Sequence, residues 1–337
     1  MSVAKYFLTG GVLLFGAIAG VGYWKRLPST SVERIAKVEK VAKEEVQELI
    51  IPVKEKKVIA PTRPIPVAVI EPPAPEKQEI LPDANRIEQL FTLGSDQLPI
   101  VETISYTSRA PWIQGRPAWI ADYAAHYGTS RHFIARSLNH KPDYLTQKVS
   151  PGDRFNVFKE GKNLEFYLLI DLSRCRMWFY YLDLDQNERV LLKTYRVGLG
   201  KLDVKKKSGA LTPVGKYRFG EKVAIYKPGV MGYYQDEQIE MIRVFGTRWI
   251  PFEKELEGCS ESARGLGLHG APWIESLEKG VLVEDVSKIG KYESDGCVRL
   301  SAEDIEEIFA IVITKPTTIE LVKDFYEAKL PGVEKER

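Results

Sequence analysis

The sequence predicts a mainly β protein with one C-terminal helix, to which a small α+β module and an N-terminal membrane helix are added. Three observations predict this class. Beyond Asn163, short runs of β-branched and aromatic residues alternate with turn residues, which is typical of strands. Residues 100–160 show the pattern of a strand, two helices and a second strand. Residues 6–24 contain no charged side chain.

Residues 1–26 are predicted to be a membrane anchor or a signal segment. As a helix, residues 6–24 are about 28 Å long, which is enough to cross a bilayer. Ala17-Ile18-Ala19 is typical of a signal-peptidase site, whereas Lys25-Arg26 and the lack of a polar region favour an uncleaved anchor. Both alternatives stay open, and because positive charges flank both ends, charge does not orient the segment.

Residues 27–99 are predicted to be a linker. Residues 32–50 are charged, with apolar residues near helical spacing, so that a helix and a solvated charged segment are equally good predictions. Residues 52–82 contain eight prolines. Such a composition is stiff and extended, and we interpret it as a spacer.

Residues 100–160 are predicted to fold as a separate βααβ module. A strand is expected over 101–107 and a helix over 117–127, followed by a second helix that Thr129-Ser130 cap, and then by a turn and a strand over 149–158. The segments Ile-Ala-x-x-Tyr, Gly-Thr-Ser and Pro-Gly-Asp-Arg-Phe resemble a LysM glycan-binding module. The Gly-Asp start of the LysM first loop is missing, so an unrelated helical spacer is the alternative.

Residues 163–325 are predicted to form the main domain, and residues 326–337 a C-terminal tail. Strands are expected over 165–172, 177–182, 189–198, 215–219 and 243–250. With one clear helix near the end, a β-sandwich is the predicted architecture.

Cys297 is the candidate nucleophile. The chain has three cysteines, and only Cys297 leads from a glycine turn into a helix start. Ser301-Ala302-Glu303-Asp304 is a capping pattern, and the apolar residues behind it repeat at helical spacing. Cys175 and Cys259 lack this context, and in an oxidising compartment they are candidates for a disulfide.

The turn before the helix is suited to acyl chemistry. It can direct the amides of Asp295, Gly296 and Cys297 at one point, as an oxyanion hole requires. In an extended segment Val298 faces inward while Cys297 and Arg299 share a face. A neighbouring guanidinium favours the thiolate.

His269 is the candidate base. The chain has four histidines, and His126, His132 and His140 lie in the upstream module. Their helical registers differ, so we interpret them as surface or packing residues. A satisfied core histidine is the alternative for His269, and its pairing with the Gly-Cys turn favours the catalytic interpretation.

These motifs resemble the L,D-transpeptidase (YkuD-type) catalytic domain of bacterial cell-wall enzymes. The resemblance rests on Leu-His-Gly at 268–270, on Ser-x-Gly-Cys-Val-Arg-Leu at 294–300, on 211–217 and on 245–250. It implies Cys297 as the nucleophile, His269 as its base and the Gly270 carbonyl as the group that orients the imidazole.

Substrate-binding residues are also assigned. Arg299 is a candidate for holding a substrate carboxylate, and pairing with Asp295 or Glu293 is its alternative role. The segment 221–240 lies where the family places a flap over the cleft. The substrate-binding residues that we assign within these motifs and this flap are Arg299, Ser294, Tyr233 and Trp249.

Two features depart from the family pattern. Asp295 stands where the family often has a second histidine, and we expect it to point away from Cys297 and to pair with Arg299 or with a lysine of the inserted segment. That segment, roughly residues 272–288, lengthens the interval between His269 and Ser294. It is expected to be an inserted helix or a lid.

The predicted function is a peptidoglycan L,D-transpeptidase that forms a Cys297 thioester with a stem peptide and transfers it to an amine, in cross-linking or in protein attachment. The alternatives are a carboxypeptidase or hydrolase of the same fold, a non-catalytic wall-binding scaffold, and a zinc site at Cys259, His269 and Cys297. No cofactor or metal is expected. The expected partners are stem peptides, glycan strands and the membrane, with carbapenems as candidate inhibitors. The net charge of +2 gives no indication of nucleic-acid binding.

The function also predicts a location in the cell envelope. An enzyme of the cell wall works outside the cytoplasm, so the expected arrangement is an anchor in the inner membrane with the catalytic domain in the periplasm or outside the membrane.

Overall fold

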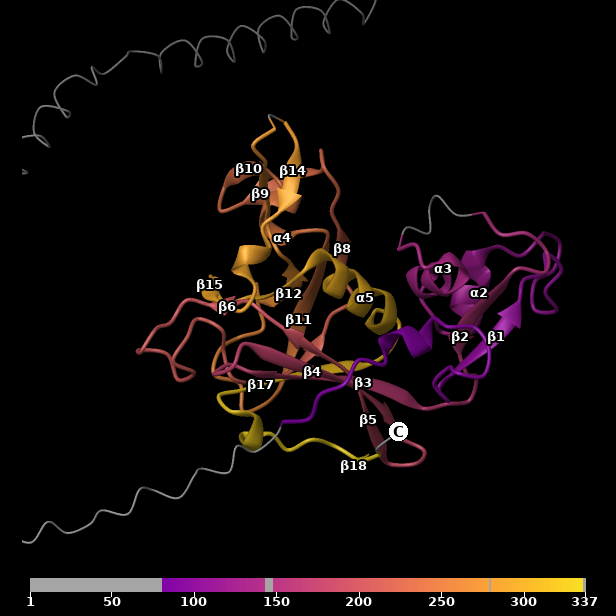
Figure 1. Ribbon diagram of the computed structural model, residues 1–337, viewed down its shortest axis with the longest axis horizontal. Helices are drawn as coiled ribbons and strands as arrows, with labels where there is room; N and C mark the ends of the chain where they lie inside the picture. The colour runs from indigo at the N-terminus through magenta and orange to yellow at the C-terminus, as the bar shows by residue number, and fades with distance from the viewer. Residues whose placement is uncertain (1–80, 143–147, 279, 336–337) are drawn as a thin grey trace, which may run out of the picture. The chain divides into compact units, whose positions relative to one another are not determined.

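The computed structural model describes residues 81–142, 148–278 and 280–335 (Figure 1). The chain divides into two units, 1–76 and 77–337, and all described residues belong to the second. The predicted membrane segment and most of the predicted linker therefore lie outside the described residues. Within the described ranges, no helix is long and apolar enough to cross a membrane.

A ten-stranded sheet forms the main body. Its strand order is β16-β12-β11-β7-β17-β3-β4-β5-β18, and β8 pairs with β11. The strands are β3 (Leu164–Asp171), β4 (Arg176–Asp183), β5 (Glu188–Arg196), β7 (Gly215–Phe219), β8 (Ala224–Ile225), β11 (Arg248–Glu257), β12 (Gly267–Gly270), β16 (Val298–Leu300), β17 (Thr317–Val322) and β18 (Val333–Glu334).

The prediction of two packed sheets is corrected to one curled sheet. Strand β11 belongs to both halves, because residues 249–251 pair with β12 whereas residues 252–257 pair with β7. The register of β11 against β7 shifts twice within this second half. Such bulges bend a strand and increase its twist, so a single sheet can wrap around the core that two sheets would have enclosed.

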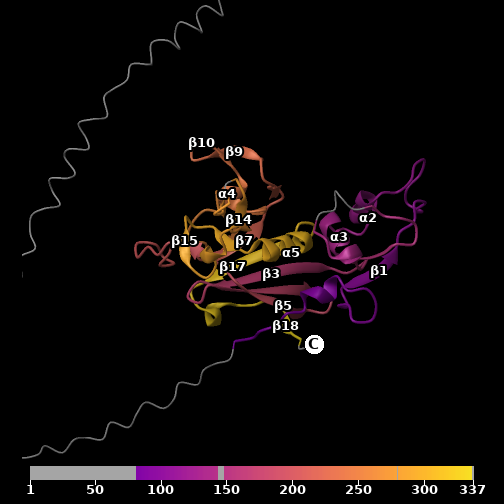
Figure 2. The ribbon, with the colours of Figure 1, turned by 45° about the horizontal axis from the view of Figure 1, so that its top comes forward.

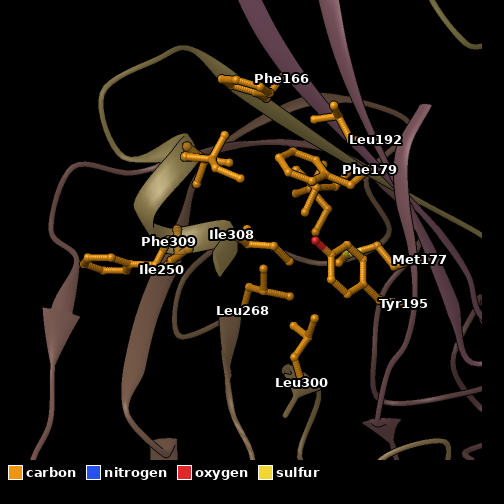
Figure 3. Close-up of a cluster of buried hydrophobic side chains, with 14 of the residues drawn as sticks. Phe166, Met177, Phe179, Leu192, Tyr195, Ile250, Leu268, Leu300, Ile308 and Phe309 are labelled. Atoms are coloured by element: carbon orange, nitrogen blue, oxygen red, sulfur yellow. The ribbon is translucent and has the colours of Figure 1, made fainter. Parts of the chain in front are cut away.

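The concave side of the sheet holds the hydrophobic core around α5 (Ala302–Val312). Ile308 and Phe309 from α5 lie among side chains from β4, β12 and β16, including Phe179, Leu268 and Leu300 (Figure 3). The helix begins as predicted, since Ser301 is its N-cap and the hydroxyl accepts a hydrogen bond from the Asp304 amide at 3.2 Å.

The other face of β3 and β4 is also buried. Tyr167, Trp178 and Tyr180 form a second apolar cluster on this face. The segment after β17, which includes the 3-10 helix η4 (Phe325–Glu327), packs against this cluster through Phe325 and Leu330, and β18 pairs with β5. The predicted C-terminal tail is thus part of the folded body.

The predicted strand–helix–helix–strand order is observed in the module. Its elements are β1 (Val101–Ser105), α2 (Ile120–His126), α3 (Arg131–Asn139) and β2 (Arg154–Phe158), and β1 pairs antiparallel with β2. Ser130 caps α3, as its hydroxyl accepts a hydrogen bond from the Phe133 amide at 3.0 Å. The first helix is shorter than predicted, because Trp119 is extended and the helix begins after it.

The module is not independent of the main body. Phe133 and Phe158 belong to the main core, and the rings of Phe158 and Phe166 lie 5.8 Å apart. Residues 81–98, which the sequence placed in the linker, pack there as well: the 3-10 helix η1 (Ile87–Leu90) buries Leu90. The indole of Trp178 donates to the Pro82 carbonyl at 2.7 Å.

Two segments near β11 differ from the predicted elements. The predicted strand 243–250 begins instead as the short helix α4 (Ile242–Phe245), because Gly246 ends the helix at a φ of 60° before β11 starts. The inserted segment, expected as a helix or a lid, is a hairpin of β13 (Trp273–Glu275) and β14 (Leu282–Glu284), followed by the 3-10 helix η3 (Val286–Lys288), so the helix alternative is wrong.

The flap is also a hairpin, formed by β9 (Met231–Tyr234) and β10 (Glu237–Glu240). Gln235 and Asp236 link the strands with φ values of 51° and 66°, as a two-residue turn with two left-handed positions requires. The β9–β10 hairpin, α4 and β14 gather at one end of the main body in both views (Figures 1 and 2).

Candidate active site

The candidate active site lies where β12 and β16 run in parallel. His269 is opposite Arg299, and Leu268 is opposite Val298. Leu268 and Val298 are completely buried in the core. Because side chains alternate along a strand, His269, Arg299 and Cys297 are directed to the other face. The pairing of β12 with β16 therefore makes Cys297 a diagonal neighbour of His269.

One ring nitrogen of His269 is engaged in a hydrogen bond to the backbone. Its Nδ1 lies 2.7 Å from the Gly270 carbonyl oxygen. Since a carbonyl oxygen only accepts, Nδ1 carries the proton and Nε2 is the basic nitrogen. The ring also contacts Phe245 at 5.3 Å and Trp249 at 5.8 Å between centroids.

Burial keeps this imidazole neutral. It lowers the pKa of His269 to about 3, and the positive charge of Arg299 acts in the same direction. The carbonyl groups of Gly270 and Phe245 oppose this effect. At neutral pH His269 is an uncharged base.

The thiol of Cys297 is also neutral at rest. Burial raises its pKa to about 11. The Gly267 backbone and Arg299 lower this pKa, whereas Asp295 raises it. The guanidinium therefore favours the thiolate, as expected, but burial has the larger effect. The resting pair is a thiol and an imidazole rather than an ion pair.

The nucleophile turn is held by Ser294. Its hydroxyl donates to the Cys297 carbonyl at 2.6 Å and accepts from the Gly296 amide at 3.2 Å. Ser294 is 1% exposed. In the described part of the chain, the amides of Asp295 and Cys297 make no hydrogen bond, so these two remain available to an oxyanion.

Asp295 and Arg299 do not pair with each other. Asp295 binds Lys201 at 2.8 Å, and both side chains are more than half exposed. Asp295 therefore pairs with the loop after β6 (Leu199–Gly200), and not with Arg299 or the inserted segment as expected. Glu293 in β15 (Tyr292–Ser294) pairs with Lys288 at 2.8 Å. Within the described ranges no acidic side chain pairs with Arg299, and its Nε is buried without a hydrogen-bond partner.

The structure distinguishes Tyr233, the flap residue assigned from the sequence, from its neighbour Tyr234. Tyr233 is 78% exposed, whereas the pKa of the Tyr234 phenol is raised by burial, by the negative charge of Asp295 and by Cys297 when its thiol is ionised. The Tyr234 ring contacts Phe245 edge-on at 5.6 Å. Adjacent residues of a strand face opposite sides, so a choice between the two tyrosines required knowledge of which face of β9 is turned to the site.

Trp249 lies on the opposite side of His269 from β16. It is the antiparallel partner of His269 on β11. Gly267 allows this approach, because a Cβ atom there would lie 2.7 Å from the indole ring. Trp249 therefore packs against the ring of His269.

The other cysteines lie apart from this pair. All three cysteines are free thiols in the structure, so the disulfide for which Cys175 and Cys259 are candidates is not formed here. The thiol of Cys259 lies 3.0 Å from the Lys216 carbonyl. Among the described residues, no group of three or more His, Cys, Asp or Glu residues could hold a metal ion. Outside the site, His126 stacks on Trp112 at 3.9 Å.

One protein-family model matches the part of the chain that contains this site. Residues 165–321 match the L,D-transpeptidase catalytic domain, YkuD. The match includes Cys297, His269 and the flap, and it excludes the βααβ module. Mainly β structure with a curled sheet and few helices fits a YkuD-like domain.

Similar solved structures are more distant. The helical cell shape determining protein Pgp2 from Campylobacter jejuni is 16% identical, with a TM-score of 0.32 and coverage of 50% of each chain. Bd1075 from Bdellovibrio bacteriovorus is 15% identical, with a TM-score of 0.30 and coverage of 47% of this chain and 48% of that one. The chain thus spans about half the length of these proteins, and no curated protein matches it.

Proposed function

We propose that the YkuD domain is a peptidoglycan L,D-transpeptidase that works through a Cys297 thioester. One observation carries this proposal: Cys297 directly precedes β16, which runs parallel to the strand of His269 with Arg299 opposite His269, and the Nδ1 contact of His269 with Gly270 leaves Nε2 for the thiol. The YkuD match supports the reaction class.

The first half-reaction forms the acyl-enzyme. Nε2 of His269 takes the Cys297 proton while the sulfur attacks a peptide carbonyl of a stem peptide, and the amides of Asp295 and Cys297 stabilise the oxyanion. When the peptide bond breaks, the leaving D-amino acid takes its proton from His269. Because the Cys297 thiol and the His269 imidazole are both neutral before reaction, proton transfer accompanies attack and no preformed thiolate is needed.

The second half-reaction regenerates the enzyme. An acceptor amine attacks the thioester carbonyl and forms the new amide bond. His269 accepts a proton from the amine and returns it to the leaving sulfur of Cys297. Water in place of the amine gives hydrolysis, so the acceptor decides between transferase and carboxypeptidase.

Arg299 is the proposed carboxylate-binding group. Its guanidinium is close enough to lower the pKa values of both Cys297 and His269, and no acidic side chain of the described chain forms a salt bridge with it, although its charge also lowers the pKa of Glu293. A planar guanidinium binds a carboxylate in bidentate geometry. Tyr234 and Trp249 are proposed to form aromatic walls around the same substrate.

Incubation of the purified protein with muropeptides tests the reaction. We expect mass spectrometry to show loss of a terminal D-amino acid, a joined product when an amine acceptor is added, and a carbapenem adduct on Cys297. Cys259→Ala is the matched control and should behave like the wild type. Hydrolysis products alone would indicate the carboxypeptidase. Absence of both turnover and a carbapenem adduct would contradict the enzyme proposal and favour a non-catalytic wall-binding scaffold.

The location of the enzyme is a separate proposal. We infer that the N-terminal segment anchors the protein in the inner membrane, that the YkuD domain lies in the periplasm or outside the membrane, and that the βααβ module binds glycan strands. The strand–helix–helix–strand order of the module supports the last point. Sedimentation of the Cys297→Ala protein with sacculi, and competition by soluble chito-oligosaccharides, tests glycan binding. Sedimentation that chito-oligosaccharides leave unchanged would count against it.

A further inference from the structure

The segment Leu211–Thr212 lies directly against the nucleophile turn. A Cβ atom on Gly296 would be 3.1 Å from the Leu211 carbonyl oxygen, so the two backbones are in contact. Gly296 also has a φ of 124°, which only glycine adopts without strain. A side chain at position 296 would therefore disturb both the backbone of the nucleophile turn and its contact with Leu211.

The Thr212 hydroxyl makes the polar contact of the segment. Its oxygen accepts the Gly200 amide at 2.7 Å, and the side chain is completely buried. A Cβ atom on Gly200 would be 2.5 Å from the Thr212 nitrogen, which shows how closely the two backbones approach. Replacement of the hydroxyl by a methyl group would leave a buried amide without an acceptor.

Gly200 connects Thr212 to the nucleophile turn. It is the β6 partner of Ser294 on β15, and the next amide, that of Lys201, donates to the Ser294 carbonyl at 2.9 Å. Ser294 in turn holds the Cys297 carbonyl and the Gly296 amide. One chain of hydrogen bonds thus runs from Thr212 to the nucleophile.

We propose that Thr212 is a positioning residue for Cys297, which acts through Gly200 and Ser294 and does not touch the thiol or the substrate. Its hydroxyl fixes β6, and β6 fixes the turn that carries the nucleophile and the oxyanion amides. The part of this proposal that concerns turnover rests on the proposed function, and the part that concerns the thiol does not.

The test compares Thr212→Val, which is nearly isosteric, with Thr212→Ser, which keeps the hydroxyl. Thr317→Val is the matched control, because Thr317 is also a buried threonine with one backbone hydrogen bond, in β17. Iodoacetamide labelling of Cys297 is followed against pH by peptide mass spectrometry, with thermal unfolding to show that each protein is folded at the assay temperature.

In Thr212→Val a looser turn gives solvent better access to Cys297, so the pH midpoint of labelling should fall by about half a unit or more. At the same time kcat should fall by about 10- to 100-fold with a similar KM, since a small misplacement affects the reacting atoms and not binding. Thr212→Ser and Thr317→Val should match the wild type in both respects.

A folded Thr212→Val protein with the wild-type labelling profile would overturn the proposal. So would a Thr212→Ser protein as impaired as Thr212→Val, because side-chain volume rather than the hydroxyl would then matter. If the wild type proves to have no turnover, the proposed function fails and the labelling profiles still decide the role of Thr212.

Discussion

His269 lies directly opposite Arg299 in the parallel pairing of β12 and β16, so a cation is adjacent to the base and two residues from the nucleophile. Arg299 lowers the pKa of His269 and also that of Cys297. The same charge therefore disfavours the imidazolium and favours the thiolate.

Replacement of Cys297 by Ala should abolish turnover and carbapenem labelling without unfolding the protein, because the side chain lies at the edge of the fold and not in its core. Cys297→Ser should also be almost inactive, as a hydroxyl is far harder to deprotonate. Product analysis by mass spectrometry checks both variants. Residual activity of more than about a few per cent in Cys297→Ala would contradict the mechanism.

The pH dependence of Cys297 labelling should reflect its raised pKa of about 11. Below this value the thiol is protonated, so the labelling rate should increase about tenfold per pH unit from pH 7 upward. Cys259, which is partly exposed, provides an internal comparison in the same digest. A plateau near pH 8 for Cys297 would mean that the turn opens in solution.

His269 should contribute to acid sensitivity. Its folded pKa of about 3 is below the unfolded value of 6.5, so the unfolded state binds the proton more tightly between these values. The contribution is complete above pH 6.5, decreases as the pH falls, and amounts to about 5 kcal/mol at most. Urea unfolding should therefore depend less steeply on pH between 6.5 and 4 in His269→Gln than in the wild type. Identical slopes would show that the folded imidazole is protonated normally.

Asp295→Asn should have a small effect. Asp295 raises the pKa of Cys297, so its neutralisation should lower the labelling midpoint, but by well under one unit because the Lys201 contact is exposed and solvent screens it. Turnover should stay within several-fold of the wild type. Lys201→Met is the matched control and should produce a comparably small change. A shift of two units or loss of turnover in Asp295→Asn would make Asp295 a working partner of the pair.

Arg299→Gln should raise KM for a stem peptide and slow Cys297 labelling at a given pH, because both a carboxylate-binding fork and a favourable charge are removed. Arg299→Lys keeps the charge and loses the fork, so labelling should recover while KM remains high. Measurement of KM and labelling rate on the two variants separates these roles. Recovery of both in Arg299→Lys would show that charge alone matters.

Removal of residues 1–162 should impair the fold of the main body. Phe133 and Phe158 belong to the main core, and their loss would expose Phe166 and leave a cavity. Circular dichroism and thermal unfolding of residues 163–337 should show a less stable protein than residues 81–337. Equal thermal stability of the two proteins would mean that the module contributes nothing to the main core.

The local elements near the nucleophile were predictable because short-range chemistry determines them. The capping pattern at Ser301 and the Gly-Cys turn specify a helix start and its preceding loop within about ten residues. The parallel pairing of β12 with β16 joins segments roughly thirty residues apart, and no local pattern encodes it. His269 was identified by elimination among the histidines and by a family motif, and its orientation became visible only in the structure.

Long-range packing explains the predictions that failed. Residues 81–98 directly follow the proline-rich segment and were predicted to belong to the linker, yet Leu90 and Phe91 are buried in the core. The strand predicted over 243–250 has suitable side chains, but the backbone of Gly246 must pass close to Gly270, and the chain coils into α4 first. Neither the burial of residues 81–98 in the core nor the close approach of Gly246 to Gly270 can be recognised from the residues of these segments alone.

The imidazole of His269 is oriented by the carbonyl group of the next residue rather than by an acidic or amide side chain. No substitution removes a backbone carbonyl, so evolution cannot lose this orienting group by a point mutation. What it can change is the path of the main chain at Gly270, where an added methyl group would meet the Thr247 nitrogen at 3.1 Å. The orientation of the His269 imidazole thus depends on the absence of a side chain at position 270.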